Sequence, residues 1–319
     1  GGQHRLGIAG TEYLGNELVA TFQIESNVQA DTGGGTLASR ETFVGIDAPW
    51  GTVKLGYFLG PYDDISPLFG NVPTLTSSIL STASIWAQGF AAKTAGGFDA
   101  RLPNSIRYDT PDLSGLTASL QMSLGEGTSY PGGVHAYVLS TGAFYVNGPL
   151  QVGIAYERNQ DARQNPVVNG QGLVDQAASI AAGWNFADFR LAGVYEYLRY
   201  ETPLASGATA TLTRNFWGLS GTLALGPGTA YGFYGRAGDG KGTALTGTRV
   251  AGLAKGPDTG ASQWELSYTY PLSKRTLLYA GYVKIDNDAN ASYTFNINPY
   301  PTAIGGQPAG FVLGTVHFF

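Results

Sequence analysis

The sequence predicts an all-β protein, a transmembrane β-barrel of sixteen antiparallel strands with a long loop folded into the lumen. Residues 1–319 form one barrel domain and encode fifteen of these strands. Three observations lead to this fold class. Apolar and polar residues alternate with a period of two along the whole chain, in segments of about ten residues, as in strands that face lipid on one side and water on the other. Short connections alternate with long ones, and aromatic residues gather at the ends of the apolar stripes.

Segment 116–124 shows the alternation most clearly, because its even positions are apolar and its odd positions are polar. The apolar stripe of segment 264–270 is mostly aromatic, and such rings prefer the headgroup level of a membrane. The core of a soluble β-sandwich would also alternate. The polar faces, however, carry Arg, Glu and Gln among many small residues, which favours a wide water-filled lumen.

Composition and charge exclude several other classes of protein. The 319 residues include 47 glycines, 19 tyrosines and 15 phenylalanines but no cysteine, so disulfide frameworks, thiolate metal sites and cysteine nucleophiles are ruled out. The net charge of -5 and the lack of a basic run argue against a nucleic-acid partner. No run of ~18 apolar residues exists that would cross a bilayer as a helix.

The connections predict the topology. Short ones, rich in Gly, Pro, Asn and Asp, are expected near 12–17, 47–52, 110–115, 147–149, 185–188, 226–229 and 271–274, and long ones near 26–39, 60–103, 125–133, 158–175, 201–213, 238–260 and 286–308. Counted from Arg5, the chain holds fifteen strands, and the last one, 310–319, ends on the short-turn side. Because bacterial single-chain barrels have even strand numbers, we expect the first strand of the barrel to precede residue 1.

Several segments resemble the trimeric general porins of Gram-negative outer membranes, specifically the anion-selective branch whose chains end in His-x-Phe. The segments that carry the resemblance follow one another in the family's order: Arg5-Leu6-Gly7-Ile8-Ala9-Gly10-Thr11-Glu12, Asn104-Ser105-Ile106-Arg107-Tyr108-Asp109-Thr110-Pro111, Leu272-Ser273-Lys274-Arg275-Thr276-Leu277-Leu278-Tyr279 and His317-Phe318-Phe319. The resemblance covers essentially the whole chain. It implies that Phe319 is the terminus used in membrane assembly.

The same resemblance implies a function and partners. We expect a homotrimer in the cell outer membrane of a Gram-negative bacterium, in contact with outer-membrane lipid and lipopolysaccharide, that lets small hydrophilic solutes and ions diffuse passively. A substrate-selective channel is the alternative, and a plugged barrel that acts as an enzyme or adhesin is a third hypothesis. No cofactor is expected.

The longest connection, 60–103, corresponds to the family's loop that folds into the barrel and forms a constriction. Its composition fits that role, because it is mostly small and apolar, with Ile79, Leu80, Ile85 and Trp86 available for packing. The alternative is an excursion on the outer surface, since long loops without regular structure often lie there.

Basic and acidic residues are expected to face each other at the constriction. By matching motifs, the resemblance assigns the basic set to Arg5, Arg40 and Arg101. Glu25, Asp63 and Asp64 supply acidic groups, the last two as an opposing wall. A cluster of arginines at the narrowest point favours anions whatever the net charge of the protein, because low-dielectric walls focus the field of fixed charges.

Alternation adds an independent argument for inward-facing cations. Arg5, Lys54, Arg107 and Arg236 each lie opposite apolar residues, and an arginine that faces lipid at the midplane costs about 2–4 kcal/mol. We therefore expect these side chains in the lumen, with Lys54 and Arg107 in the constriction. The alternative for any one arginine is a salt bridge to a lumen carboxylate such as Glu25, Glu157 or Glu196, with no part in permeation.

Other motifs are weak. Gly235-x4-Gly240-Lys241 imitates a phosphate loop, but Gly242 replaces the Ser or Thr that would hold magnesium. Asp286, Asp288 and Asn290 imitate the start of a calcium loop whose later ligands are lacking, so only adventitious calcium is expected there. The three histidines, His4, His135 and His317, have no nucleophile nearby in sequence, so we do not expect an enzyme.

Overall fold

The computed structural model describes residues 4–29, 33–71, 73–74, 78–88, 97–125, 136–161, 172–297, 299 and 301–318. In this part of the chain the regular structure consists of β-strands and two short 3-10 helices, which confirms the all-β fold class. No helix among these residues is long and apolar enough to cross a membrane.

One antiparallel sheet contains nearly all of the strands, and each strand pairs with its neighbours along the chain. Its path is β1 (His4–Gly15), β2 (Leu18–Val28), β4 (Thr42–Ala48), β5 (Gly51–Leu59), β6 (Arg101–Asp109), β7 (Leu116–Leu124), β8 (Tyr137–Asn147), β9 (Leu150–Gln160), β10 (Val174–Asn185), β11 (Phe189–Pro203), β12 (Thr209–Leu225), β13 (Gly228–Ala237), β16 (Ala261–Pro271), β17 (Thr276–Asn287) and β18 (Ala309–His317). The two-residue β3 (Gly35–Thr36) pairs with β2, and β14 (Arg249–Val250) pairs with β15 (Leu253–Ala254) in a separate sheet. The path confirms the fifteen strands expected from the alternation.

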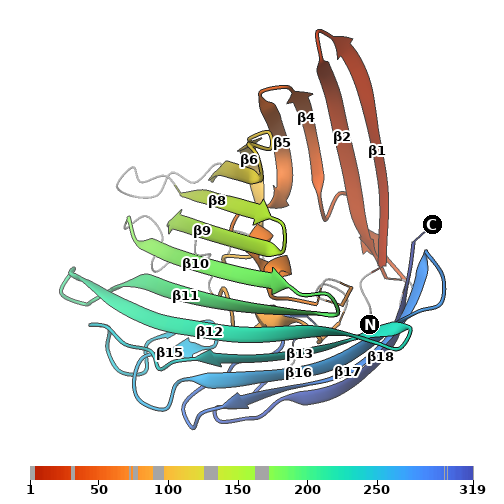
Figure 1. Cartoon of the computed structure of the whole chain (residues 1–319). Helices are drawn as coiled ribbons and strands as arrows, with labels where there is room; N and C mark the ends of the chain where they lie inside the picture. Colours follow the sequence, from red (N-terminus) through yellow and green to blue (C-terminus); the bar gives the residue numbers. More distant parts are fainter. Residues whose placement is uncertain are drawn as a thin grey trace.

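The sheet curls around a central space, as Figure 1 shows. Among the described residues, β1 pairs with β2 alone and β18 with β17 alone, so the sheet has two edges. Because an odd number of antiparallel strands separates them, these two edge strands run in the same direction. The additional strand expected ahead of residue 1 stays a prediction.

The outer face of the sheet is apolar and exposed. In β7, Leu116 and Leu120 point outward while Gln121 and Ser123 are buried on the inner face. On the far side of the sheet, Leu266 of β16 is 67% exposed and Leu313 of β18 is 82% exposed. An outward apolar face of this extent is what a strand needs in order to contact lipid.

The described part of the long connection between β5 and β6 lies inside the curled sheet, where the orange ribbon of Figure 1 marks its first helical turns. It contains the 3-10 helices η1 (Asp63–Leu68) and η2 (Thr82–Ser84). Hydrogen bonds tie its described part to several strands: Tyr62 N donates to Ser140 Oγ (3.1 Å), and Tyr231 Oη donates to the carbonyl of Phe69 (2.6 Å). Because β6 begins at Arg101, the connection covers residues 60–100 and is shorter than the segment 60–103 expected from sequence.

Glycines in the wall let this connection come close. A Cβ atom at Gly281 of β17 would lie 2.8 Å from Leu80 Cδ1, and one at Gly153 of β9 would lie 2.7 Å from Leu68 Cδ1. Any larger residue at these positions would push the connection away from the wall. The glycine content of the strands therefore shapes the interior as well as the sheet.

The interior has two different walls. Along β10 to β17 the inner face is largely apolar, and aromatic and aliphatic residues of the connection pack on it in one core that includes Tyr62, Ile65, Phe69, Leu80, Trp86, Val194, Leu198, Phe216 and Phe233. Along β1 to β6 the inner face carries charges instead. The charged groups that line an open cavity thus lie on this side of the lumen, whereas charged groups on the other side, such as the Glu196–Arg214 pair, are buried.

The packed wall explains why the expectation for Arg236 is wrong. In the second half of β13 the buried residues are Tyr231, Phe233, Gly235 and Ala237, so Arg236 points outward, where it pairs with Asp288 (Nη2 to Oδ2, 2.6 Å). It lies near the end of β13, next to the long connection and clear of the middle of the apolar band. Alternation assigned it to the lumen because both faces of this strand carry aromatic residues.

Candidate functional site

The charged wall forms a cavity that brings together seven of the eight residues expected at the constriction. Its volume is about 330 Å³. It is lined by Arg5, Glu25, Arg40, Glu41, Lys54, Phe58, Leu59, Asp64, Arg101 and Arg107. These residues come from the neighbouring strands β1, β2, β5 and β6, from the segment that leads into β4, and from η1. Asp63 does not line this cavity, although it is next to Asp64 in the chain.

Ion pairs hold the cationic side chains in place. Arg40 donates to Glu25, and Arg5 Nε lies 4.0 Å from the same carboxylate. Arg101 Nε donates to Glu41 Oε1 at 3.1 Å. These pairs fit the alternative that lumen carboxylates bind the arginines, but they leave the cationic groups as part of the cavity surface.

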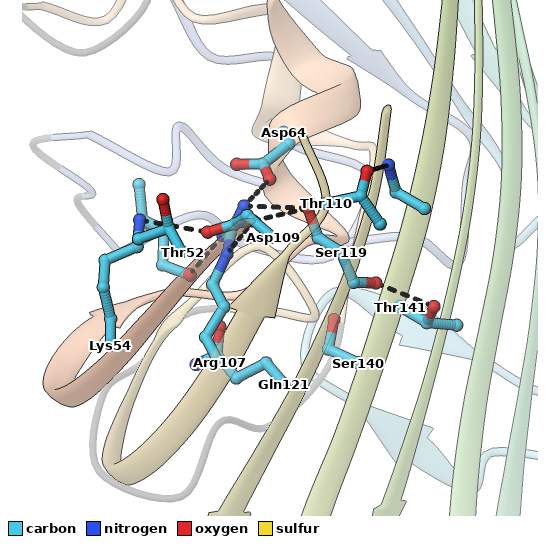
Figure 2. A network of polar contacts seen from close by, with 12 residues as sticks. Thr52, Lys54, Asp64, Arg107, Asp109, Thr110, Ser119, Gln121, Ser140 and Thr141 are labelled. Carbon is cyan, nitrogen blue, oxygen red and sulfur yellow. Dashed lines mark hydrogen bonds and ion pairs between the residues drawn. The ribbon is translucent and has the colours of Figure 1, made fainter. Parts of the chain in front are cut away.

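Arg107 lies at the centre of the most extensive network, which Figure 2 shows. Its Nη2 donates to Asp64 Oδ2 on η1 at 2.6 Å and its Nε donates to Asp109 Oδ1 at 2.8 Å. Ser119 Oγ of β7 donates to the same Asp109 oxygen at 2.6 Å. Lys54 Nζ on β5 lies 3.3 Å from the other oxygen of Asp109. One arginine therefore joins the inserted connection to the wall of β6 and β7.

The charge of the cavity is positive. Five cationic and three acidic side chains line it, and Asp109 lies next to it. Burial, together with the nearby Arg101 guanidinium, lowers the pKa of Arg40, and the hydrogen bond to Glu25 opposes that shift. Arginine keeps its proton in proteins, so these groups stay charged.

The acidic residues of the connection are less strongly acidic than usual. Burial, reinforced by Asp99 and Asp64, raises the pKa of Asp63. Burial also raises the pKa of Asp64, although Arg107 opposes it. The pKa of Asp99 rises to about 6, again mainly through burial. Of the two residues expected to form an acidic wall opposite the arginines, Asp64 is bound directly to Arg107 and Asp63 does not line the cavity.

Sequence reasoning missed Glu41 and Asp109 as members of the charged network. Asp109 is two residues beyond Arg107 in a strand, so strict alternation places it on the same face, and this signal was sufficient to find it. Glu41 lies next to Arg40 in an irregular segment ahead of β4, where a two-residue period carries no information.

The other carboxylates named as arginine partners lie under the inserted connection. Glu196 of β11 pairs with Arg214 of β12 at 2.7 Å, and both side chains are fully buried. Glu157 of β9 is also buried, close to Ser140 and to the start of the connection at Gly60. Of the three candidates, only Glu25 reaches the cationic residues of the cavity. Phe319 lies outside the described residues.

The weak motifs form no chemical site in the described chain. Asp288 pairs with Arg236, Asp286 pairs with Lys284, and the side-chain amide of Asn290 donates to the carbonyl of Pro257 (3.1 Å), so the three side chains have separate partners. Among the described residues no group of three His, Cys, Asp or Glu side chains is arranged to hold a metal ion. His317 Nδ1 lies 2.8 Å from Thr276 Oγ1, and His135 is outside the described part.

Comparison with known proteins places this geometry in a family. Residues 1–290 match a family model described as Gram-negative porin. An outer membrane porin protein of Bordetella pertussis is 26% identical, over 86% of this chain and 75% of that protein. Outer membrane porin protein 32 of Delftia acidovorans is 27% identical, over 96% of this chain and 80% of that protein.

Solved structures share the fold. An anion-selective porin from Comamonas acidovorans aligns with a TM-score of 0.73 at 24% identity, over 99% of this chain and 89% of that one. The trimer form of OmpT of Vibrio cholerae aligns with a TM-score of 0.70 at 12% identity, over 99% of this chain and 92% of that one. Both likenesses concern the arrangement of the strands around the lumen.

Proposed function

The chain belongs to the Gram-negative porin family, and we propose that its pore passes small hydrophilic solutes with a moderate preference for anions. It is an outer-membrane channel for passive diffusion and not an enzyme. The main observation that supports the anion preference is the positive charge of the cavity between β1 and β6. The name of the Comamonas protein, an anion-selective porin, supports the same direction.

The proposed constriction lies at this cavity, where Asp64 of η1 meets Arg107 of β6. Arg5, Arg40 and Arg101 supply the field that attracts anions, with Lys54 and Arg107 on the same wall. Fixed charges in a low-dielectric channel lower the barrier for ions of opposite sign, and the effect weakens as salt screens it. Glu25 and Glu41 hold two of the arginines in position and keep the preference moderate.

We also propose that three copies assemble as a homotrimer and that the outward face contacts outer-membrane lipid and lipopolysaccharide. The exposed apolar residues of the outer face support contact with a membrane. The trimer form in which OmpT of Vibrio cholerae was solved supports three-fold assembly.

Conductance of the purified protein in a planar bilayer tests the proposed function. A trimer should insert with three equal conductance steps, and under a salt gradient the reversal potential should have the sign of an anion-preferring pore. Arg101→Gln should reduce the preference, because it removes a cation from the cavity. Arg199→Gln is the matched control, since Arg199 pairs with Glu201 on β11, away from the cavity.

Two results would count against the general pore. If millimolar or lower concentrations of one solute block the current, a substrate-selective channel replaces it. A folded protein without measurable conductance would instead point to a plugged barrel.

A further inference from the structure

A second cavity adjoins the charged one, and the two share a wall. The second cavity also has a volume of about 330 Å³, and it is lined by Asp64, Arg107, Asp109, Thr110, Thr117, Ala118, Ser119 and Phe144. Besides the charged Asp64, Arg107 and Asp109, its polar groups are the hydroxyls of Thr110, Thr117 and Ser119, whereas the first cavity is lined mainly by charges. Asp64 and Arg107 belong to both cavities.

The two cavities follow one another along the strands. The first cavity includes Leu59 and Arg101, where β5 and β6 meet the long connection. The second includes Thr110 and Thr117, which flank the short turn between β6 and β7. Arg107 lies between these ends on β6. A solute that travels along the lumen on this side meets the charged cavity and the hydroxyl-lined cavity in succession.

The hydrogen bonds of Arg107 hold together the wall that the two cavities share. Besides its bonds to Asp64 and Asp109, Arg107 donates from Nη1 to the carbonyl of Leu59 (3.3 Å) and from Nη2 to Ser119 Oγ (3.2 Å). A guanidinium has five N–H groups in a fixed plane, so this arrangement occupies most of them. The side chain of Arg107 is only 11% exposed. In this conformation Arg107 lies in the wall that both cavities share, and its guanidinium exposes little surface to a passing ion.

We infer that the Asp64–Arg107 ion pair is the partition between two chambers of the pore, and that Asp64 is the positioning residue that holds η1 against β6. This inference rests on the proposed function, because a partition matters only if solutes pass. Asp64 restricts passage in two ways. Its carboxylate keeps the start of the inserted connection against the wall, and it cancels the charge of the arginine that would otherwise attract anions.

Asp63 provides a matched control within the same helix. It is the preceding residue of η1 and carries the same side chain, but it lines neither cavity. Asp63→Asn and Asp64→Asn therefore replace the same carboxyl group with an amide at neighbouring positions of the connection. Only the second change releases Arg107.

The first readout is single-channel conductance with the reversal potential under a salt gradient. Asp64→Asn should give a larger conductance than the unchanged protein and a reversal potential shifted further toward anions, and Asp64→Glu should restore both values. Asp63→Asn should give a smaller shift of the reversal potential and no gain in conductance. The inference is overturned if Asp64→Asn leaves conductance unchanged or lowers it, or if the two asparagine variants behave alike.

A second readout detects the partition directly. The chain contains no cysteine, so Thr117→Cys places a single thiol in the hydroxyl-lined chamber. An anionic thiol reagent added on the side of the long connections should modify this cysteine faster when Asp64→Asn is also present. Equal rates in both backgrounds overturn the partition. If the unchanged protein conducts no ions at all, the proposed function fails, whereas normal conductance with equal rates refutes the partition alone.

Discussion

Replacing Glu196 with glutamine should loosen the connection between β5 and β6 while leaving the sheet intact. The Glu196 carboxylate accepts hydrogen bonds from Tyr62 Oη (2.8 Å) and the backbone N–H of Ala87 (2.8 Å), which are near opposite ends of the packed part of the connection. It also pairs with Arg214, whose Nη1 donates to the carbonyl of Ile85 at 2.6 Å. This one carboxylate therefore binds the connection directly and neutralises the arginine that binds it too.

The magnitude follows from the burial of the pair. Removing one partner of a fully buried ion pair costs about 3–5 kcal/mol, because the remaining charge stays in a low-dielectric site without compensation. Since about 1.4 kcal/mol corresponds to a factor of ten, the fraction of molecules with the connection detached should rise by roughly 10²- to 10⁴-fold.

Amide hydrogen exchange of peptides that cover residues 61–71 and 78–88 measures this detachment, because exchange reports rare open states. Glu201→Gln is the control, since Glu201 lies on the same strand and pairs with Arg199 at 2.9 Å, without a hydrogen bond or ion pair to the described residues of the connection. Protection of both peptides should fall in Glu196→Gln and stay normal in Glu201→Gln. Unchanged protection in Glu196→Gln would refute the assignment of this carboxylate as the anchor.

Three further outcomes are expected. Trp86→Ala should weaken the same docking by about 3–5 kcal/mol, because Trp86 is buried and stacks on Tyr62 with ring centroids 5.3 Å apart; an exchange rate equal to that of the unchanged protein would contradict this. Anion preference should increase as the pH falls through about 6, because Asp99 loses the charge that offsets Arg101, and Asp99→Asn should remove that part of the pH dependence of the reversal potential. Glu25→Gln should strengthen anion preference by releasing Arg5 and Arg40 from their shared carboxylate, and a weaker preference would mean that this carboxylate is needed to hold them at the cavity surface.

The architecture was predictable because its signal is periodic. A strand between lipid and water must alternate, so β7 and its neighbours are visible in the sequence as strands and their faces can be assigned. The grouping of Arg5, Lys54 and Arg107 was predictable for a related reason. Sequential strands are neighbours in the sheet, so inward residues at similar heights meet.

The details of the site depend on contacts that no local pattern encodes. Asp63 and Asp64 lie in the 3-10 helix η1, where a two-residue period carries no information, so the sequence did not distinguish Asp64, which reaches Arg107, from Asp63, which does not line the cavity. Arg236 was misplaced because the inner face of β13 is apolar where the inserted connection packs on it. That packing depends on partners distant in sequence, such as Tyr62 and Glu196.

The unequal walls of the lumen have a consequence for how such a channel can diverge. The packed side, from β10 to β17, buries the apolar core of the inserted segment, whereas the charged side, from β1 to β6, faces the solute. Substitutions on the charged side alter which ions pass while leaving the apolar core that secures the segment untouched. Single substitutions on the charged side can therefore change ion permeability at little cost in folding free energy. Related channels can keep the same fold and differ in the solutes that they prefer.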